Sequence, residues 1–393
     1  MSSVVPDGWS KNTINECCEI LDSQRVPVNS EERAKRKGDY PYYGANGVQG
    51  YIDDYIFEGD AILLAEDGGN FDQYADRPIA QWVTGKFWVN NHAHILRAKD
   101  NATDKWIFYS LVHKNILKNI NGGTRAKLNQ SDLKEIEILL SPLPEQKKIA
   151  SILTSVDEVI ENTQKQIDKL QDLKKATMNE LLTKGIGHTE FKDSELGRIP
   201  RSWEVRAISE VVSIPNGQVD PKLEPYASMP HIGSGNIISW TGQIRGVQTA
   251  FEAGQISGKY LFSKNHILYS KVRPNLAKVC MPKFDGICSA DVYPLIPKQK
   301  VSGKFVFQYL LTEKFTQIAT EVSERTGMPK INRQDLNVLK LPMPPFEEQS
   351  EIARKIEAID KATSLKSIKL AQTQSLKKSL MQDLLTGRVR VNL

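Results

Sequence analysis

The chain has 393 residues, of which 40% are hydrophobic and 25% charged, a composition typical of globular proteins with two or three domains. It has no apolar run long enough to span a bilayer, and its first ten residues lack the features of a signal peptide. Its four cysteines form no CxxC pair, which excludes a disulfide-rich scaffold, and we expect a cytoplasmic protein. The net charge of +5, from 52 basic and 47 acidic residues, is too small to indicate a nucleic-acid partner by itself.

The first 126 residues predict a mixed, mainly β module, which we call module one. Short apolar runs at 61–65 and 94–96 have the length of strands. Turn-forming asparagine and glycine residues lie between such runs, at 46–47 and 67–70. A helical pattern follows near Trp106 to Leu117.

A long amphipathic helix is predicted after Pro144. Apolar residues recur every three or four positions from Ile149 to Leu181, and neither proline nor glycine interrupts the stretch before Gly185. About 40 residues at about 1.5 Å each make a rod of roughly 60 Å. Because a small module cannot bury the whole apolar stripe of such a rod, we expect it to pack on a second helix as a coiled coil.

The chain repeats itself. Residues 127–183 align with residues 330–386 without a gap, at a constant offset of 203. Both copies carry a Lys-x-Asn-x-x-Asp-Leu motif, a Pro-x-x-Glu-Gln motif and a Leu-Leu-Thr motif. A register kept over this length indicates a duplication, so the second copy predicts another long helix, ending at Gly387.

The segments before the two helices correspond less closely but in the same order. Both begin with a Pro-x-x-Trp motif, at Pro6–Trp9 and Pro200–Trp203, and a second helical pattern lies near Phe305 to Ile318. The chain is therefore predicted to be an α+β protein with a pseudo-twofold internal repeat, in which two mixed, mainly β modules are separated by two long helices. The boundaries are 1–126 for module one, 127–186 for the first helical region, 187–203 for a linker and the start of the second repeat, 204–329 for module two, and 330–393 for the second helical region.

No catalytic site is identified in the sequence. There is no GxxxxGK[ST] loop for ATP and no glycine fingerprint of a dinucleotide or methyl-donor site. Met343-Pro344-Pro345-Phe346 is superficially similar to a motif of amino-methyltransferases, but Met343 is a poor hydrogen-bond acceptor, so we interpret it as the proline break before the second helix. His92-x-His94 is interpreted as a satisfied strand pair rather than a metal site, and Glu66-Asp67 as turn residues or a base contact rather than a catalytic pair. We expect no cofactor and no metal in this chain.

The ordered set of motifs resembles the specificity subunit of Type I restriction-modification enzymes over essentially the whole chain. The resemblance includes the duplicated Pro-x-x-Trp starts, the helix motifs, and two runs similar to segments of target recognition domains, at 41–47 and 268–275. One departure is Ser141, where the second copy has Pro344 and the family usually has a Pro-Pro pair. This departure affects only where the first helix begins.

The resemblance implies a division of labour among several chains. Each module would be a target recognition domain that reads one half of a bipartite sequence in double-stranded DNA, and the helices would form an antiparallel coiled coil that sets the spacing. Two modification (methyltransferase) subunits would dock on the helices and modules, and restriction (helicase-nuclease) subunits would join them. S-adenosylmethionine, ATP and Mg would be bound by these partners, and the chain itself would be non-catalytic.

Charge is unevenly distributed along the chain. Module one holds 14 basic and 17 acidic residues, whereas module two holds 14 and 10, and residues 330–393 hold 12 and 7. An acidic module is unexpected for a DNA binder that acts alone. We therefore expect weak DNA binding by the isolated chain, with Lys35, Arg36 and Lys37 of module one as either a solvated face or phosphate contacts.

The two modules differ in charge at one aligned loop. Aligning Ile62 with Ile267 places Glu66 opposite Lys271 and Gly68 opposite Arg273. Glutamate can accept a hydrogen bond from cytosine N4, whereas lysine and arginine can donate to guanine O6 and N7. We therefore predict that this loop faces DNA in both modules, unless it is only a surface turn. Further candidates in neighbouring turns are Tyr43, Asn46, Asn70 and Asn275, of which Tyr43 could equally be a core residue.

Two other functions stay open at this point. A coiled-coil scaffold that binds proteins and reads no DNA would share the long helices. A self-sufficient DNA methyltransferase would need a methyl-donor site, which the sequence does not reveal.

Overall fold

The computed structural model describes residues 5–122, 126–323 and 329–392, and the chain divides into two compact units. Unit 1 comprises Met1–Gln164 and Ile368–Leu393, and unit 2 comprises Lys165–Ser367. Each unit thus contains one module together with part of both long helices. Within the described residues, no helix combines the length and the apolar character needed to cross a membrane.

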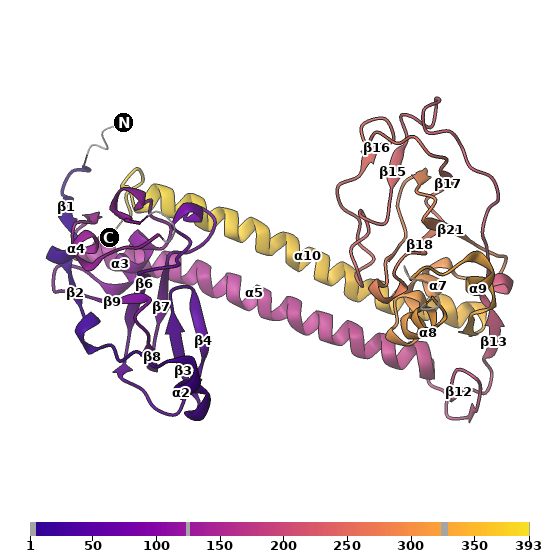
Figure 1. The fold of residues 1–393 in the computed structure, drawn as a ribbon, viewed down its shortest axis with the longest axis horizontal. Coiled ribbons are helices and arrows are strands. Elements are labelled where there is room, and N and C mark those ends of the chain that lie inside the picture. The colour runs from indigo at the N-terminus through magenta and orange to yellow at the C-terminus, as the bar shows by residue number, and fades with distance from the viewer. Residues whose placement is uncertain (1–4, 123–125, 324–328, 393) are drawn as a thin grey trace. The chain divides into compact units, whose positions relative to one another are not determined.

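Module one contains two four-stranded sheets (Figure 1). Their strand orders are β2-β9-β6-β7 and β4-β3-β8-β5, and all neighbouring strands are antiparallel except β3 and β8. A further pair joins β1 to β10. The strands are β1 (Ser10–Thr13), β2 (Cys18–Ile20), β3 (Tyr40–Gly44), β4 (Gly47–Ile52), β5 (Phe57–Glu58), β6 (Ala61–Ala65), β7 (Ala80–Val83), β8 (Lys86–Val89), β9 (Ala93–Ala98) and β10 (Glu137–Leu140); the α-helices are α1 (Ile14–Cys17), α2 (Ser30–Lys35), α3 (Asp104–Leu111) and α4 (Gln130–Lys134).

The apolar run at 61–65 is the central strand β6, and all five of its residues are buried. Ile62 and Leu64 belong to one hydrophobic cluster, whereas Ala61 and Leu63 belong to another. A strand that is covered on both faces reads as a continuous apolar run instead of an alternating one. Burial on both faces therefore accounts for the continuous apolar run in the sequence.

Module two repeats the same topology. Its sheets have the orders β14-β21-β18-β19 and β16-β15-β20-β17, β13 pairs with β22, and β15 and β20 are the parallel pair. A short pair, β11 (Phe191–Lys192) with β12 (Ile199–Pro200), precedes the module. The remaining elements are β13 (Glu204–Ala207), α6 (Ile208–Val211), β14 (Val212–Ser213), β15 (Pro230–Ile232), β16 (Gln248–Thr249), β17 (Tyr260–Phe262), β18 (Ile267–Ser270), β19 (Val279–Cys280), β20 (Gly286–Cys288), β21 (Val292–Pro297), α7 (Gly303–Leu310), α8 (Glu313–Ser323), α9 (Arg333–Val338) and β22 (Lys340–Met343).

The internal repeat is therefore confirmed beyond the helices. Strand order is the same in both modules, and so is the position of the one parallel pair found among their described residues. The helical pattern near Phe305 to Ile318 is, however, two helices instead of one. Thr312 directly precedes α8 and caps its start, since its hydroxyl accepts a hydrogen bond from the Phe315 amide at 3.2 Å.

The two predicted long helices are confirmed as α5 (Leu143–Lys184) and α10 (Phe346–Leu384). The residues that precede each helix are not helical throughout, because β10 and β22 lie between the Lys-x-Asn-x-x-Asp-Leu motif and the helix start. The long helix therefore fills 143–184 of the predicted region 127–186. Met343 ends β22 directly before the two prolines, as the interpretation of that motif as a helix break requires.

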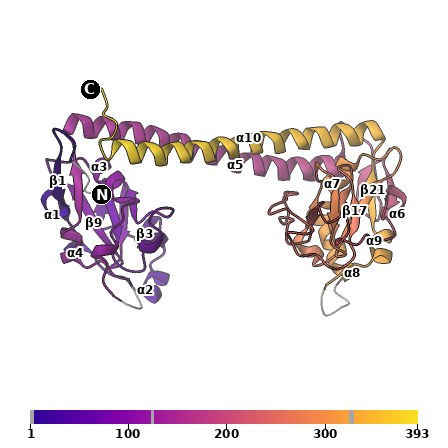
Figure 2. The same cartoon turned by 90° about the horizontal axis from the view of Figure 1, so that it is seen from above.

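The helices run side by side within each unit (Figure 2), and the repeated Asp and Lys residues pair them. In unit 1, Lys377 Nζ lies 2.6 Å from Asp157 Oδ1, and in unit 2, Lys174 Nζ lies 2.7 Å from Asp360 Oδ1. Asp157 and Asp360 are equivalent residues of the repeat, as are Lys174 and Lys377. The early part of each helix thus pairs with the late part of the other, which is an antiparallel arrangement.

The Pro-x-x-Trp and Pro-x-x-Glu-Gln motifs meet in each unit. Trp9 Nε1 donates to Glu145 Oε2 at 3.0 Å, and Trp203 Nε1 donates to Glu348 Oε2 at the same distance. The neighbouring glutamines bond the backbone before their helices, through Ser141 O and Pro344 O, both at 2.8 Å. Ser141 therefore supports the helix start by the same carbonyl contact as Pro344.

Each of these glutamates also binds the segment that follows the other long helix. Arg390 donates to both Glu145 oxygens, at 2.7 and 2.9 Å, through Nε and Nη2. Glu348 accepts from the Ile186 amide at 3.0 Å and lies 2.8 Å from His188 Nε2. In each unit, one glutamate therefore binds both the tryptophan at the start of the module and the segment that follows the other long helix, while lying itself at the start of its own helix.

Module two contains two buried basic side chains without a carboxylate partner among the described residues. Lys259 is 1% exposed, and its ammonium donates only to Ser257, at the carbonyl and the hydroxyl. His231 is buried beside it on β15, and its Nε2 has no hydrogen-bond partner within the described part of the chain. Burial first, and the Lys259 charge second, lower the pKa of His231 to about 4.

We expect this histidine to make unit 2 sensitive to acid. The unfolded chain takes up a proton at an ordinary histidine pKa of about 6.5, whereas the folded chain does so only near 4. The contribution of His231 to the free energy of unfolding is therefore fully present above pH 6.5. It falls as the pH drops from 6.5 to 4, by about 2 kcal/mol after allowance for solvent screening. Urea unfolding should show that the free energy of unfolding decreases less between pH 7.5 and pH 4.5 in His231→Gln than in the wild type. Equal losses in the two proteins would contradict this role.

Candidate nucleic-acid interface

The loops after β6 and β18 are structurally equivalent, as the alignment of Ile62 with Ile267 predicts. The Leu128 amide donates to Glu66 O at 2.7 Å, and the Ile331 amide donates to Lys271 O at 2.9 Å. Because Leu128 and Ile331 are equivalent residues of the repeat, Glu66 and Lys271 occupy the same backbone position. The opposite charges at this position are therefore a property of one shared structural site.

In module one, Glu66 is held inside a charged cluster. Arg25 Nη1 lies 2.7 Å from Glu66 Oε2, and Lys127 Nζ lies 3.4 Å from Oε1. The Glu66 side chain is only 14% exposed. Its carboxylate is thus largely engaged by cations of the chain itself, which leaves it little capacity to accept from a base.

The same cluster contains a group of acidic and histidine side chains, found among the described residues, whose spacing would suit a metal ion. Ligand atoms of Asp22, Glu66 and His94 lie within 4.8 Å of one another. His94 is nevertheless already bonded, to Asp22 Oδ2 at 2.6 Å and to Leu128 O at 2.9 Å, and Arg25 approaches Asp22 to 3.3 Å. The guanidinium supplies the positive charge that these carboxylates need, so we interpret the cluster as a structural ion-pair network.

His92 is paired as well, with its Nδ1 2.5 Å from Asp67 Oδ1. Both histidines of the His-x-His motif therefore have a hydrogen-bond partner, although only His94 lies in a strand (β9) and His92 precedes it in a turn. Sequence reasoning missed Arg25 and Asp22, because they lie about 40 residues before the loop and no motif marks them.

In module two, the Lys271 ammonium is also partly engaged by neighbouring side chains. Its Nζ lies 3.4 Å from Asp291 Oδ1 and 5.5 Å from the centroid of the Tyr293 ring. Lys330 approaches the same Asp291 carboxylate at 3.6 Å. Two lysines thus share one carboxylate, so these three side chains together carry a net positive charge at this loop.

Arg273 differs from these lysines. It is exposed, and within the described ranges no hydrogen bond or ion pair holds its guanidinium. Its backbone is in the left-handed region, with φ of 51° and ψ of 67°, and its amide donates to Pro329 O at 2.8 Å. Such a backbone is costly for a residue with a Cβ, and strain of this kind concentrates at functional sites.

Asn275 follows Arg273 in a short 3₁₀ turn, Pro274–Leu276, and is exposed. Ala277, at the end of the turn, also has a positive φ of 42°. A nearby arginine that the sequence did not single out, Arg333, donates to the carbonyl of Pro215 at 2.9 Å and to the Asn216 side chain. The turn therefore presents Arg273 and Asn275, while Arg333 braces the neighbouring loop.

Asn46 and Asn70 form an amide pair in module one. Asn46 Nδ2 donates to Gly68 O at 2.8 Å, and Asn70 Nδ2 donates to Asn46 Oδ1 at 3.1 Å. The pair fixes the β3–β4 turn against the loop that follows β6. One donor hydrogen and one acceptor lone pair of the exposed Asn46 amide stay unused by these two bonds.

The remaining candidates lie around α2 and β3. Lys35 and Lys37 are exposed, whereas Arg36 pairs with Asp53 at 2.8 Å and lies 4.9 Å from the Trp88 ring. Tyr43 is half-buried against Phe87, and burial raises the pKa of its phenol. The structure therefore presents Lys35 and Lys37 to solvent and holds Arg36 and Tyr43 in packed positions.

Comparison with known proteins connects this architecture to a family. A family described as Type I restriction modification DNA specificity domain matches residues 6–172 and 200–374, once per repeat. The EcoDI specificity subunit of Escherichia coli is 29% identical over 90% of this chain and 82% of its own length. The MjaVIII specificity subunit of Methanocaldococcus jannaschii is 28% identical over 98% and 94%, respectively.

A solved structure shows the same fold. The crystal structure of an S subunit of a Type I restriction-modification system from M. genitalium superposes with a TM-score of 0.66 at 16% identity, over 98% of this chain and 96% of that one. The family match covers most of the chain and both repeats. The chain therefore belongs to the family of Type I restriction-modification DNA specificity proteins.

Proposed function

We propose that this chain is the DNA-recognition subunit of a Type I restriction-modification complex, in which each module reads one half of a bipartite, asymmetric target. The observation that carries the proposal is the shared loop after β6 and β18, where module two presents the exposed Arg273 and module one has a glutamate, Glu66, that its own cations engage. Two scaffolds with the same fold but different side chains at one site suit two different half-sites. Family membership favours this function over a scaffold that reads no DNA.

In module two, Arg273 is the residue that reads a base. Its guanidinium is unpaired within the described residues, and its fork of donors matches guanine O6 and N7. Lys271 and Lys330, which share Asp291, add positive potential close to it. Asn275 provides a second polar contact from the same turn, so module two favours a half-site that contains guanine.

In module one, the amide pair of Asn46 and Asn70 takes the equivalent role, because Glu66 is neutralised by Arg25 and Lys127. Lys35 and Lys37 contact phosphates, and Arg36 and Tyr43 support the surface from which they project. The net acidic character of this module limits its own contribution to affinity.

The chemistry of the complex belongs to other chains. Two modification subunits that bind S-adenosylmethionine dock on this chain, and restriction subunits that use ATP and Mg complete the enzyme. This chain contributes recognition and carries no catalytic residue of its own. The names of its relatives, which are subunits of restriction enzymes, support this assignment.

The proposal predicts a large difference in DNA affinity between the isolated chain and the complex. A fluorescent duplex that contains the target should bind at least about 100-fold more weakly to the chain alone than to the chain with modification subunits at the same salt concentration. The physical reason is the acidic module one, which needs cationic surface from a partner to hold phosphates. Fluorescence anisotropy at physiological ionic strength measures both affinities, and equal nanomolar affinities would contradict the proposal.

A further inference from the structure

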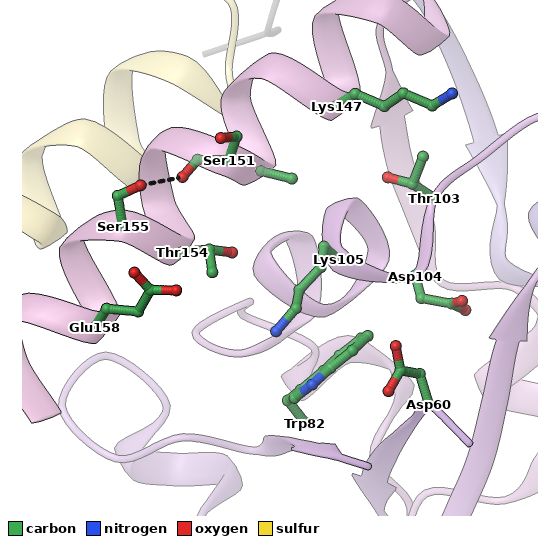
Figure 3. Close-up of a pocket in the computed structure, with 11 residues that line it drawn as sticks. Asp60, Trp82, Thr103, Asp104, Lys105, Lys147, Ser151, Thr154, Ser155 and Glu158 are labelled. Carbon is green, nitrogen blue, oxygen red and sulfur yellow. Dashed lines mark hydrogen bonds between the residues drawn. The ribbon is translucent and has the colours of Figure 1, made fainter. Parts of the chain in front are cut away.

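Unit 1 contains a pocket of about 490 Å³ between module one and the early part of α5 (Figure 3). Trp82 of β7 and Lys105 of α3 form one wall, and Thr154 and Glu158 of α5 face them. The other lining residues are Asp60, Thr103, Asp104, Lys147, Ala150, Ser151 and Ser155. None of these residues has a role in the DNA-reading surface described above.

Lys105 is the unusual residue of this pocket. Its Nζ lies 3.7 Å from the centroid of the Trp82 ring and 5.9 Å from that of Phe108. Among the described residues, no carboxylate or other hydrogen-bond partner contacts this ammonium, and burial lowers its pKa. A partly desolvated cation over an aromatic ring is a strong attachment point for an anion, because little further desolvation is needed.

The second repeat shows which kind of group binds the lysine at the position equivalent to Lys105. Lys304 is the counterpart of Lys105 in unit 2, and its Nζ bonds both oxygens of Glu357 of α10, at 3.0 and 2.7 Å. The repeat places Thr154 where unit 2 has Glu357. Thr154 cannot pair with Lys105, and its hydroxyl lies 3.1 Å from that of Tyr109 instead. Unit 1 has therefore kept the lysine but lost the carboxylate that bonds it directly. Asp60, Asp157 and Glu158 act on the ammonium only from a greater distance, where they oppose the lowering of its pKa by burial.

The charges around the pocket specify the kind of ligand. Asp60 and Glu158 have no ion-pair partner in the described part of the chain, and Asp104 accepts from the Ala98 amide. These carboxylates disfavour a multiply charged anion such as a phosphate group. They suit a polypeptide that places one carboxylate on Lys105 and basic side chains on Asp60 and Glu158.

We infer that this pocket is a docking site for an acidic side chain of a partner polypeptide, which supplies in trans the carboxylate that Glu357 supplies in unit 2. The inference rests on the proposed function in taking the modification subunit as that partner. Because Lys304 already has its internal carboxylate, the corresponding surface of unit 2 does not capture an acidic side chain in this way. The two units thus present different surfaces to partners.

The most direct test of this docking site is Thr154→Glu, which gives unit 1 the glutamate that unit 2 has at the equivalent position. The new carboxylate should pair with Lys105, fill part of the pocket and leave the protein folded. We expect calorimetry with the purified modification subunit to show affinity at least about tenfold lower at one of its two sites on the chain, with the melting temperature unchanged or raised. Lys105→Met, which keeps an apolar stem over Trp82 but removes the charge, should weaken binding to a similar degree.

The matched control is Lys304→Met, which removes a lysine that is already paired within the chain. It should leave affinity for the modification subunit within about twofold of the wild type. A wild-type chain that fails to bind the modification subunit would overturn the proposed function together with this inference. A wild-type chain that binds, combined with folded Thr154→Glu and Lys105→Met variants of unchanged affinity, would overturn the docking site alone.

Discussion

Arg273→Ala, measured in the complex with modification subunits, is expected to lose about 1–3 kcal/mol of binding free energy for the cognate target and to relax sequence preference at one position of one half-site. The reason is that Arg273 is the exposed guanidinium of the module-two loop that no described residue neutralises. Binding to duplexes with a changed base pair at that position should be affected much less. Selection from a randomised duplex pool measures both effects.

Arg273→Lys and Lys283→Ala are the matched variants for this test. Arg273→Lys keeps the charge but removes the planar fork, so it should lose discrimination while keeping much of the affinity for all sequences. Lys283 is an exposed lysine of the same module, and its replacement should change neither property. If Arg273→Ala instead weakens all duplexes equally, Arg273 contacts a phosphate and does not read a base.

Glu348→Ala is expected to destabilise unit 2 by about 2–4 kcal/mol, because it leaves buried donors without an acceptor. The indole of Trp203 and the amide of Ile186 both depend on this carboxylate. Glu145→Ala should do the same to unit 1 through Trp9, since Glu145 is only 2% exposed. Amide hydrogen exchange, which resolves individual strands, should show the loss in β13 and β22 for the first variant and in β1 and β10 for the second.

The two variants serve as controls for each other. Glu348→Ala should leave the amides of module one protected from exchange, and Glu145→Ala should leave those of module two protected. The surface change Glu347→Ala, next to Glu348 on α10, should leave exchange unaffected in both units. Uniform loss of protection throughout the chain in either glutamate variant would show that the units do not unfold separately.

The long helices and the duplication could be predicted from the sequence because they depend on local periodicity and on a register that survives in the residues. Glu145 and Glu348 recur in the repeat for a reason that the structure supplies: each ties a tryptophan and a helix end together. The equivalence of Glu66 and Lys271 could also be predicted, since the buried strands β6 and β18 anchor the alignment. Buried strands tolerate few changes, and so they keep the alignment that the loops lose.

The state of each candidate side chain could not be predicted, because it depends on partners distant in sequence. Glu66 looked like an accessible acceptor, but Arg25 neutralises it from a loop 41 residues earlier. Arg36 looked equivalent to Lys35 and Lys37, but Asp53 and Trp88 hold it. The empty partner position of Lys105 becomes visible only by comparison with Lys304 and Glu357 in the folded second unit.

Mapping of methylated bases in DNA from cells that express this chain with its modification subunits tests the central claim most directly. We predict one asymmetric motif with two defined half-sites and a fixed number of unspecified bases between them. The Arg273→Ala chain should relax only the half-site read by module two. A continuous or palindromic motif, or methylation that is the same without this chain, would contradict the account.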